Sequence, residues 1–183
     1  MEKLDCSFAF ELTDHGLFQL LSLCGDNLET LDIDDTCVTC NMLSIENLPH
    51  IQNLKSLNCS STSLVDSGLL QLLRLWGNTL THLDIGDNDI TGEGLSELGV
   101  CSLPCIEEIS LWCENLSDDG LVKFLKLCKK TVKSLYIGGS SKITGEGVDG
   151  IEVRHVRLRL FCLSISIFVL IYLSLNKKCV FYI

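Results

Sequence analysis

The sequence repeats itself at a fixed interval, and this repeat constrains the fold more than any other feature. Three apolar residues at positions i, i+3 and i+5 recur in five copies, which begin at residues 28, 54, 80, 106 and 132. The copies are Leu28/Leu31/Ile33, Leu54/Leu57/Cys59, Leu80/Leu83/Ile85, Ile106/Ile109/Leu111 and Val132/Leu135/Ile137. A fixed period of this length indicates a repeat architecture, in which each unit buries its apolar face against its neighbours.

Each 26-residue unit predicts a strand followed by a helix. The L-x-x-L-x-L run predicts a short strand whose alternate residues point into the core. The phrases LTDHG, LVDSG and LSDDG then supply Thr, Ser and Asp for helix N-caps, with acids suited to the first helical turn. Leucines at helical spacing follow them, as at Leu17, Leu20, Leu21 and Leu23.

A longer period, of two units, overlies the shorter one. The segments that begin at Gly16, Gly68 and Gly120 are similar to one another, whereas the two intervening units are looser and each carry a proline. We infer an ancestral duplication of a pair of units. A strand is also expected near residues 2–7, although its triplet is degenerate. Because neither end offers the polar cap that stacked repeats need, truncation is expected at the amino-terminal end.

These residues resemble leucine-rich repeats of the cysteine-containing and ribonuclease-inhibitor-like types, over residues 12–152. The L-[ST]-D-x-G-L phrase is similar to the repeats of F-box/leucine-rich-repeat ubiquitin-ligase substrate receptors, and NDITGEGLSEL from Asn88 resembles the ribonuclease-inhibitor type. The resemblance implies an α/β leucine-rich-repeat solenoid, a right-handed βα horseshoe arc of about five to six 26-residue repeats. It also implies a parallel sheet on the concave face and helices on the convex face.

The charge is divided between two segments. Residues 1–152 contain all 24 acidic residues and nine basic ones, a net charge of −15, whereas residues 153–183 contain five basic residues and no acidic one. We therefore expect a leucine-rich repeat domain over 1–152 and a separate, basic-flanked apolar tail over 153–183. So acidic a domain argues against nucleic-acid binding, which needs clustered Lys and Arg.

The tail is open to three interpretations. Its uncharged stretch, residues 160–175, has basic residues on both sides, which favours a membrane anchor over residues 158–176. The stretch is shorter than the usual span of about 20 residues. The triplet Leu160/Leu163/Ile165 has near-correct phase for a sixth repeat strand. The abrupt change in composition favours the third interpretation, an end that is not native to the repeat array.

The composition and the first residues bear on the compartment. Hydrophobic residues make up 46% of the chain, which argues against disorder. The opening MEKLDCSFAFELTDHG lacks the apolar region and cleavage site of a secretory signal. We therefore interpret the eleven cysteines as reduced thiols of a cytoplasmic or nuclear protein, which would be membrane-anchored if the tail is a true span.

The outward-facing positions of the strands predict a surface for a partner. In leucine-rich repeats these positions line the concave sheet, and here they are rich in acids, with two aromatic residues near the carboxyl-terminal end. We expect a basic peptide or protein to bind there, on Glu29, Asp32, Asp34, Asp84, Glu107, Glu108, Trp112 and Tyr136. Exposed aromatic residues are enriched at binding hot spots. The alternative is that the acids only keep the sheet soluble.

Candidate catalytic and metal-binding patterns are weak. The four histidines fall in unrelated repeat positions without a nucleophile or triad context. Cys37-x-x-Cys40 lacks the second pair of ligands that a structural zinc needs, and no phosphate-binding motif is present. The sequence therefore predicts no catalytic residue, no metal and no cofactor.

The resemblance implies non-catalytic protein recognition, in its first version as the substrate-recognition part of a ubiquitin ligase. The alternative function is a membrane-tethered receptor-like or adaptor protein, which depends on the tail alone.

Overall fold

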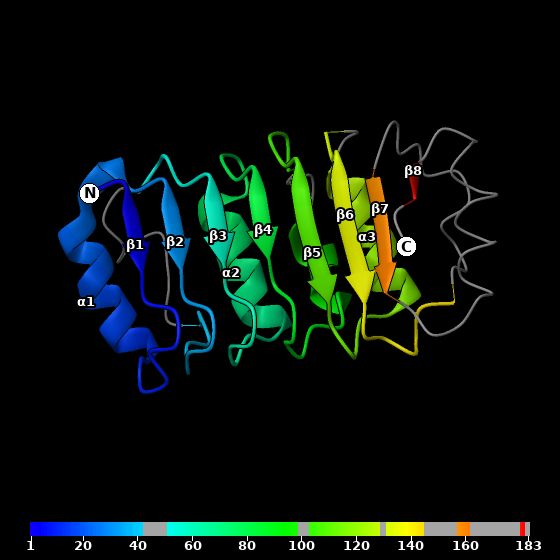
Figure 1. Cartoon of the computed structure of the whole chain (residues 1–183), viewed down its shortest axis with the longest axis horizontal. Helices are drawn as coiled ribbons and strands as arrows, with labels where there is room; N and C mark the ends of the chain where they lie inside the picture. Colours follow the sequence, from blue (N-terminus) through cyan, green and yellow to red (C-terminus); the bar gives the residue numbers. More distant parts are fainter. Residues whose placement is uncertain (42–50, 99–102, 129–130, 145–156, 162–179, 182–183) are drawn as a thin grey trace.

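The computed structural model describes the chain except for residues 42–50, 99–102, 129–130, 145–156, 162–179 and 182–183. Helices lie on one face of a single parallel sheet, as predicted, and the strands stand side by side along the longest axis of the molecule (Figure 1). This mixed α/β arrangement is consistent with a fold like that of leucine-rich repeats.

The sheet has eight strands in the order of the sequence, and every neighbouring pair is parallel. The strands are β1 (Lys3–Asp5), β2 (Thr30–Asp32), β3 (Ser56–Asn58), β4 (His82–Asp84), β5 (Glu108–Trp112), β6 (Ser134–Gly138), β7 (Arg157–Phe161) and β8 (Val180–Phe181). From β2 to β6 the register advances by one repeat unit per strand, so that Leu31 pairs with Leu57 and Leu57 with Leu83. The degenerate segment near residues 2–7 contains β1.

Among the described residues, the three α-helices begin 52 residues apart and so follow the longer, two-unit period. They are α1 (Asp14–Cys24), α2 (Asp66–Trp76) and α3 (Asp118–Leu127). A short 3₁₀ helix, η1 (Gly25–Asn27), continues α1, and another, η2 (Glu93–Leu98), takes the place of an α-helix after β4. The described part of the looser unit that contains Gly94 is therefore 3₁₀ helix, where the units on either side have α2 and α3.

The core lies between the sheet and the helices and is built from the repeated apolar columns. All fifteen residues of the five triplets are buried, none more than 5% exposed. Cys24, Trp76 and Cys128, which recur at a spacing of 52 residues, are also buried. The Trp76 Nε1 donates a hydrogen bond to the carbonyl of Ile51 at 3.1 Å. Leu23 differs from Leu17 and Leu21 of the same helix, which are fully buried, because 82% of its surface is exposed.

Aspartates in the first turns of the helices bind the following unit. Asp66 accepts hydrogen bonds from the backbone N–H of Thr91 at 3.2 Å and of Gly92 at 3.0 Å, and also from the Thr91 hydroxyl. Asp14 makes the equivalent bonds to Thr39 and Cys40, and Asp118 to Thr144. The expected side-chain N-cap occurs at α3 alone among these three helices, where Ser117 accepts from Gly120. The acids therefore connect units in addition to suiting the helix dipole.

A buried asparagine joins the third and fourth strands. The Oδ1 of Asn88 accepts from the N–H of Thr62 and of Leu64, at 3.2 and 3.1 Å, and from the Thr62 hydroxyl at 2.9 Å. Its Nδ2 lies 2.7 to 3.2 Å from the carbonyl oxygens of Cys59, Ile85 and Gly86. One side chain thereby satisfies backbone groups of two adjacent turns.

The tail adds a strand with a register other than the expected one. β7 pairs with β6 so that Leu158 lies beside Leu135 and Leu160 beside Ile137, which corrects the predicted triplet Leu160/Leu163/Ile165. Most of the predicted membrane span over 158–176 falls outside the described residues. Among the residues that the structure describes, no helix is long and apolar enough to cross a membrane.

Candidate protein-binding face

The candidate face is the side of the sheet opposite the helices. Buried and outward-facing residues alternate along the strands, and the parallel register aligns the outward ones into rows. One row contains Asp32, Asn58, Asp84, Ser110 and Tyr136, and another contains Thr30, Ser56, His82, Glu108 and Ser134. The structure thus places Asp32, Asp84 and Tyr136 in one row, and Glu108 in the neighbouring one.

Two of the expected partner-binding acids form ion pairs with the next strand. The Glu29 Oε1 lies 2.7 Å from the Lys55 Nζ, and the Glu107 Oε1 lies 2.7 Å from the Lys133 Nζ. Both pairs are largely exposed, so each stabilises the fold by about 0–1 kcal/mol at most. Their main effect is that each lysine neutralises the charge of its glutamate. The edge of the face at the amino-terminal ends of the strands therefore carries both acidic and basic side chains.

Asp32 and Asp84 belong to a row of side chains that close the strand-end turns. Each accepts a hydrogen bond from the backbone N–H two residues ahead, Asp32 from Asp34 at 3.2 Å and Asp84 from Gly86 at 2.9 Å. Asp5 and Asn58 repeat the contact. At Asp5, side-chain hydrogen bonds from Ser7 and Lys3 lower the pKa to about 2. The row therefore stabilises turns, and each carboxylate keeps lone pairs for another donor.

Asp34 is also engaged, since its Oδ1 accepts from the Ser60 hydroxyl at 2.6 Å. Glu108 is half-buried on β5, beside the exposed His82 of β4. The expected acids are thus distributed over three strands, β2, β4 and β5. Half of them, Glu29, Asp34 and Glu107, contact the next unit.

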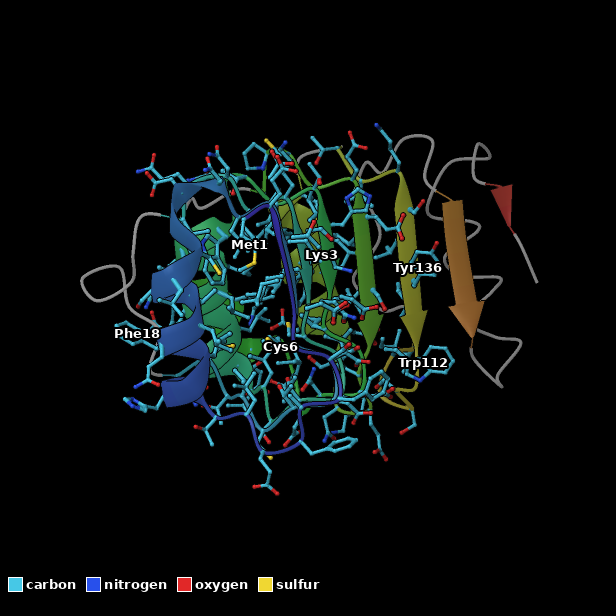
Figure 2. All side chains as sticks on the ribbon, turned by 60° about the vertical axis from the view of Figure 1, so that its left-hand side comes forward. Met1, Lys3, Cys6, Phe18, Trp112 and Tyr136 are labelled. Carbon is cyan, nitrogen blue, oxygen red and sulfur yellow. The ribbon has the colours of Figure 1, made fainter. Side chains whose placement is uncertain are left out.

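Trp112 ends β5 and is 41% exposed. Figure 2 shows Trp112 and Tyr136 on the same side of the sheet, away from the helices. Tyr136 is half-buried on β6, where it pairs with Ser110, two residues before Trp112. A Cβ built on Gly139 would lie 2.6 Å from the Trp112 Cδ1, so the indole lies against the backbone of the following turn. The two expected aromatic residues are therefore close neighbours on adjacent strands.

A cavity of about 500 Å³ opens beside Trp112. It is lined by Asp87, Asn88, Asp89, Trp112, Glu114, Asn115 and Gly139. Its rim holds a network in which the Asn115 Nδ2 donates to Asp89 at 2.7 Å and the Lys142 Nζ donates to Asn115 at 2.6 Å. The single ammonium of Lys142 therefore offsets only part of the charge of three carboxylates.

The sequence prediction missed the acids of this cavity. Asp87, Asp89 and Glu114 lie in the turns after β4 and β5, beyond the strand positions that were expected to carry the surface. Their signal is visible in the phrases IGDND and LWCEN, where acids follow the last strand residue directly. The acidic part of the face thus extends to the carboxyl-terminal ends of the strands.

The cysteines of the Cys37-x-x-Cys40 pattern and the lysine Lys123 of α3 have surroundings that do not indicate another site. Cys37 is exposed, whereas Cys40 is fully buried, and burial raises the pKa of the Cys40 thiol. Within the described part of the chain, no group of three or more His, Cys, Asp or Glu side chains could hold a metal ion. On α3, the Lys123 Nζ lies 2.6 Å from an Asp119 carboxylate, as on a solvated helix face.

Residues 78–99 match a family model described as Leucine Rich repeat. The match begins just after α2 and covers β4 and η2, including Asn88 and its turn. Leucine-rich repeats are generally non-catalytic and commonly mediate contacts between proteins. Together with the parallel sheet, this match supports a leucine-rich repeat protein.

Proposed function

We propose that the chain is a leucine-rich-repeat solenoid of five to six units that binds a basic segment of another protein on its acidic sheet face. The observation that carries this proposal is the position of Trp112, an exposed aromatic residue at the mouth of a cavity lined by Asp87, Asp89 and Glu114. Aromatic faces attract ammonium and guanidinium groups, and carboxylates pair with the same groups.

The division of charge favours the carboxyl-terminal edge of the face as the main contact. Lysines neutralise Glu29 and Glu107 at the opposite edge, whereas the turns after β4 and β5 add three carboxylates. The five strands from β2 to β6, at a spacing of about 4.8 Å, span about 19 Å. This length suits a peptide or a small surface of a folded protein. An arginine side chain over the Trp112 indole, with Tyr136 as a second apolar anchor, is the contact we expect at the centre.

The test is selection of peptides from a random displayed library on the full chain. We expect the bound peptides to be enriched in Arg and Lys, and their affinity to fall as salt screens the charges. Trp112→Ala/Tyr136→Ala should weaken a selected peptide at least tenfold, which is about 1.4 kcal/mol. Phe8→Ala/Phe10→Ala removes two exposed aromatic residues elsewhere and serves as the matched control.

Selected peptides without basic enrichment would overturn the proposal, as would equal affinity for wild type and the Trp112/Tyr136 variant. Asp87→Asn/Asp89→Asn separates the contribution of charge from that of the aromatic anchors. It should weaken basic peptides and reduce the dependence of their binding on salt.

A narrower version, in which the bound protein is a substrate of a ubiquitin ligase, has the support of the L-[ST]-D-x-G-L phrases at Leu12 and Leu116. Its test is whether ligase subunits co-purify with the full chain and whether the bound protein becomes longer-lived when the chain is depleted. If they do not, the narrower version fails while peptide binding stands.

A further inference from the structure

A row of three side chains lies at the rim of the cavity beside Trp112 and connects three consecutive units. Asp89, Asn115 and Lys142 each stand directly before the buried apolar residue of their turn, which is Ile90, Leu116 or Ile143. The Asn115 Nδ2 donates to the Asp89 Oδ1 at 2.7 Å, and the Lys142 Nζ donates to the Asn115 Oδ1 at 2.6 Å. Both ends of the Asn115 amide are therefore engaged, one by a carboxylate and the other by an ammonium group.

The turn that carries Lys142 is held in place by a buried serine. The Lys142 N–H donates to the Ser140 Oγ at 3.0 Å, and this hydroxyl donates to the carbonyl of Leu116 at 2.7 Å. Ser140 is only 4% exposed, so the backbone at Lys142 is anchored on the preceding unit. A cation of the chain itself thus already lies at the rim of this cavity, on the side of Asp89.

Two other carboxylates line the cavity together with Trp112. The Asp87 N–H donates to the Trp112 carbonyl at 2.6 Å, and Glu114 follows Trp112 by two residues. Both acids are exposed, and within the described part of the chain neither forms an ion pair with a Lys or Arg side chain. The cavity therefore has one part that Lys142 neutralises and another part where two acids accompany an exposed aromatic ring.

We propose that Lys142 makes this cavity select arginine over lysine in the segment that binds there. This inference rests on the proposed binding of a basic segment to the acidic sheet face. The ammonium group of an incoming lysine is a compact, strongly hydrated charge. It would compete with Lys142 for the Asn115 Oδ1 and for the neighbouring Asp89, and the two like charges would repel each other.

An arginine side chain avoids this competition. Its guanidinium is planar and weakly hydrated, so it can lie on the face of the Trp112 ring. From there its fork of N–H donors can reach Asp87 and Glu114, because carboxylates accept pairs of hydrogen bonds from a guanidinium. Lys142 thus occupies the position that suits a lysine and leaves open the position that suits an arginine.

Calorimetric titration of the full chain with two defined peptides tests the inference. Both peptides have blocked ends and carry three cations at alternate positions between glycines, arginine in one and lysine in the other, so their charges are equal. We expect wild type to bind the arginine peptide roughly fivefold more tightly than the lysine peptide. Lys142→Met should lower this ratio to about twofold or less, mainly by strengthening the lysine peptide. Lys142→Arg keeps the cation and should keep the preference.

Lys133→Met is the matched control, because it removes the same charge from the same face, at the ion pair with Glu107. It should strengthen both peptides alike and leave the preference for arginine unchanged. Thermal unfolding checks that each variant is folded.

The outcomes separate this inference from the proposed function. Equal binding of the two peptides to wild type would overturn the selectivity while the binding of basic segments stands. An unchanged ratio in Lys142→Met would overturn the role of Lys142, and so would an equal fall of the ratio in Lys133→Met. If wild type binds neither peptide at millimolar concentrations, the proposed function fails together with this inference.

Discussion

The backbone oxygen of Thr39 occupies the space beside Gly68 where a side chain would begin: a Cβ on Gly68 would lie 2.1 Å from it. The same relationship recurs two units later, where a Cβ on Gly120 would lie 2.1 Å from the oxygen of Thr91. Gly16 holds the equivalent place in α1, and its nearest neighbour there is the Leu12 Cδ1 at 3.0 Å. The repeated glycine is therefore required where a helix begins against the preceding unit.

Alanine at these glycines should accordingly have opposite effects. We expect Gly68→Ala and Gly120→Ala to lower the free energy of unfolding by about 2–3 kcal/mol, because the backbone of the preceding unit must shift. Gly16→Ala should be neutral or stabilise by up to about 1 kcal/mol, since alanine favours the helix and only a flexible leucine must move. Urea denaturation of the three variants measures this, and equal losses at all three positions would contradict it.

Asn88 should be the polar side chain whose loss is most costly. Asn88→Ala leaves the backbone N–H groups of Thr62 and Leu64, and carbonyl groups of two turns, without their partner. We expect this to lower the free energy of unfolding by about 2–4 kcal/mol. Asn53→Ala is the control, because Asn53 is exposed and donates one hydrogen bond to Asp26. Chemical denaturation gives both values. A loss at Asn88 no larger than at Asn53 would show that water replaces the asparagine.

The aspartate that connects units should matter more than a neighbouring acid on the surface. Asp66→Ala removes the acceptor for Thr91 and Gly92 and should cost about 2–3 kcal/mol, since hydrogen bonds to a charged group are strong. Asp119→Ala removes an exposed partner of Lys123 and should cost less than about 1 kcal/mol. Hydrogen exchange at the amide of Gly92 should also accelerate in the Asp66 variant alone.

Burial should divide the described cysteines into two classes of reactivity. Cys37 and Cys105 are exposed and should react with iodoacetamide in the native protein, whereas burial raises the pKa of Cys113 and Cys128 to about 12. Because the thiolate is the nucleophile, these two should react only after unfolding, as site-resolved mass spectrometry can show.

The same shift has a consequence for stability. Unfolded thiols ionise from about pH 9 upward, while the buried ones stay neutral. The stability due to the buried thiols is therefore complete below pH 9 and declines as the pH rises from there towards about 12. Cys128→Ala should reduce this alkaline decline, and an unchanged pH dependence in that variant would assign the decline to other groups.

The repeated triplets suffice to predict the strands and the core, because a buried position needs only an apolar residue at the right phase. The longer, two-unit period likewise anticipates where α1, α2 and α3 lie. The exposure of Leu23 does not follow from its spacing, since burial depends on whether a neighbouring unit covers it. The register of β7 could not be predicted from the repeat either, because the apolar residues of the tail fit the triplet in more than one alignment.

The acidic and aromatic composition of the candidate face is visible in the sequence, whereas the contacts of its residues are less so. The pairing of Glu29 with Lys55 follows from the sequence, because a lysine follows the glutamate at the same position of the next unit. The cavity beside Trp112 could not be inferred in this way, because turns from three units form its wall. Asp14, Asp66 and Asp118 recur visibly, yet the sequence does not show which neighbour each one binds.

The short 3₁₀ helix η2 between α2 and α3 has a consequence for the curvature of the sheet. An α-helix with its side chains is about 10–12 Å wide, close to two strand spacings of about 4.8 Å, so an α-helix behind every strand would crowd the outer layer and bend the sheet. Here α2 and α3 lie two strands apart, with the shorter and narrower η2 between them. We therefore expect the sheet to be flatter than in an array with an α-helix in every unit. Its outward face should hold an extended segment and should not wrap around a globular partner.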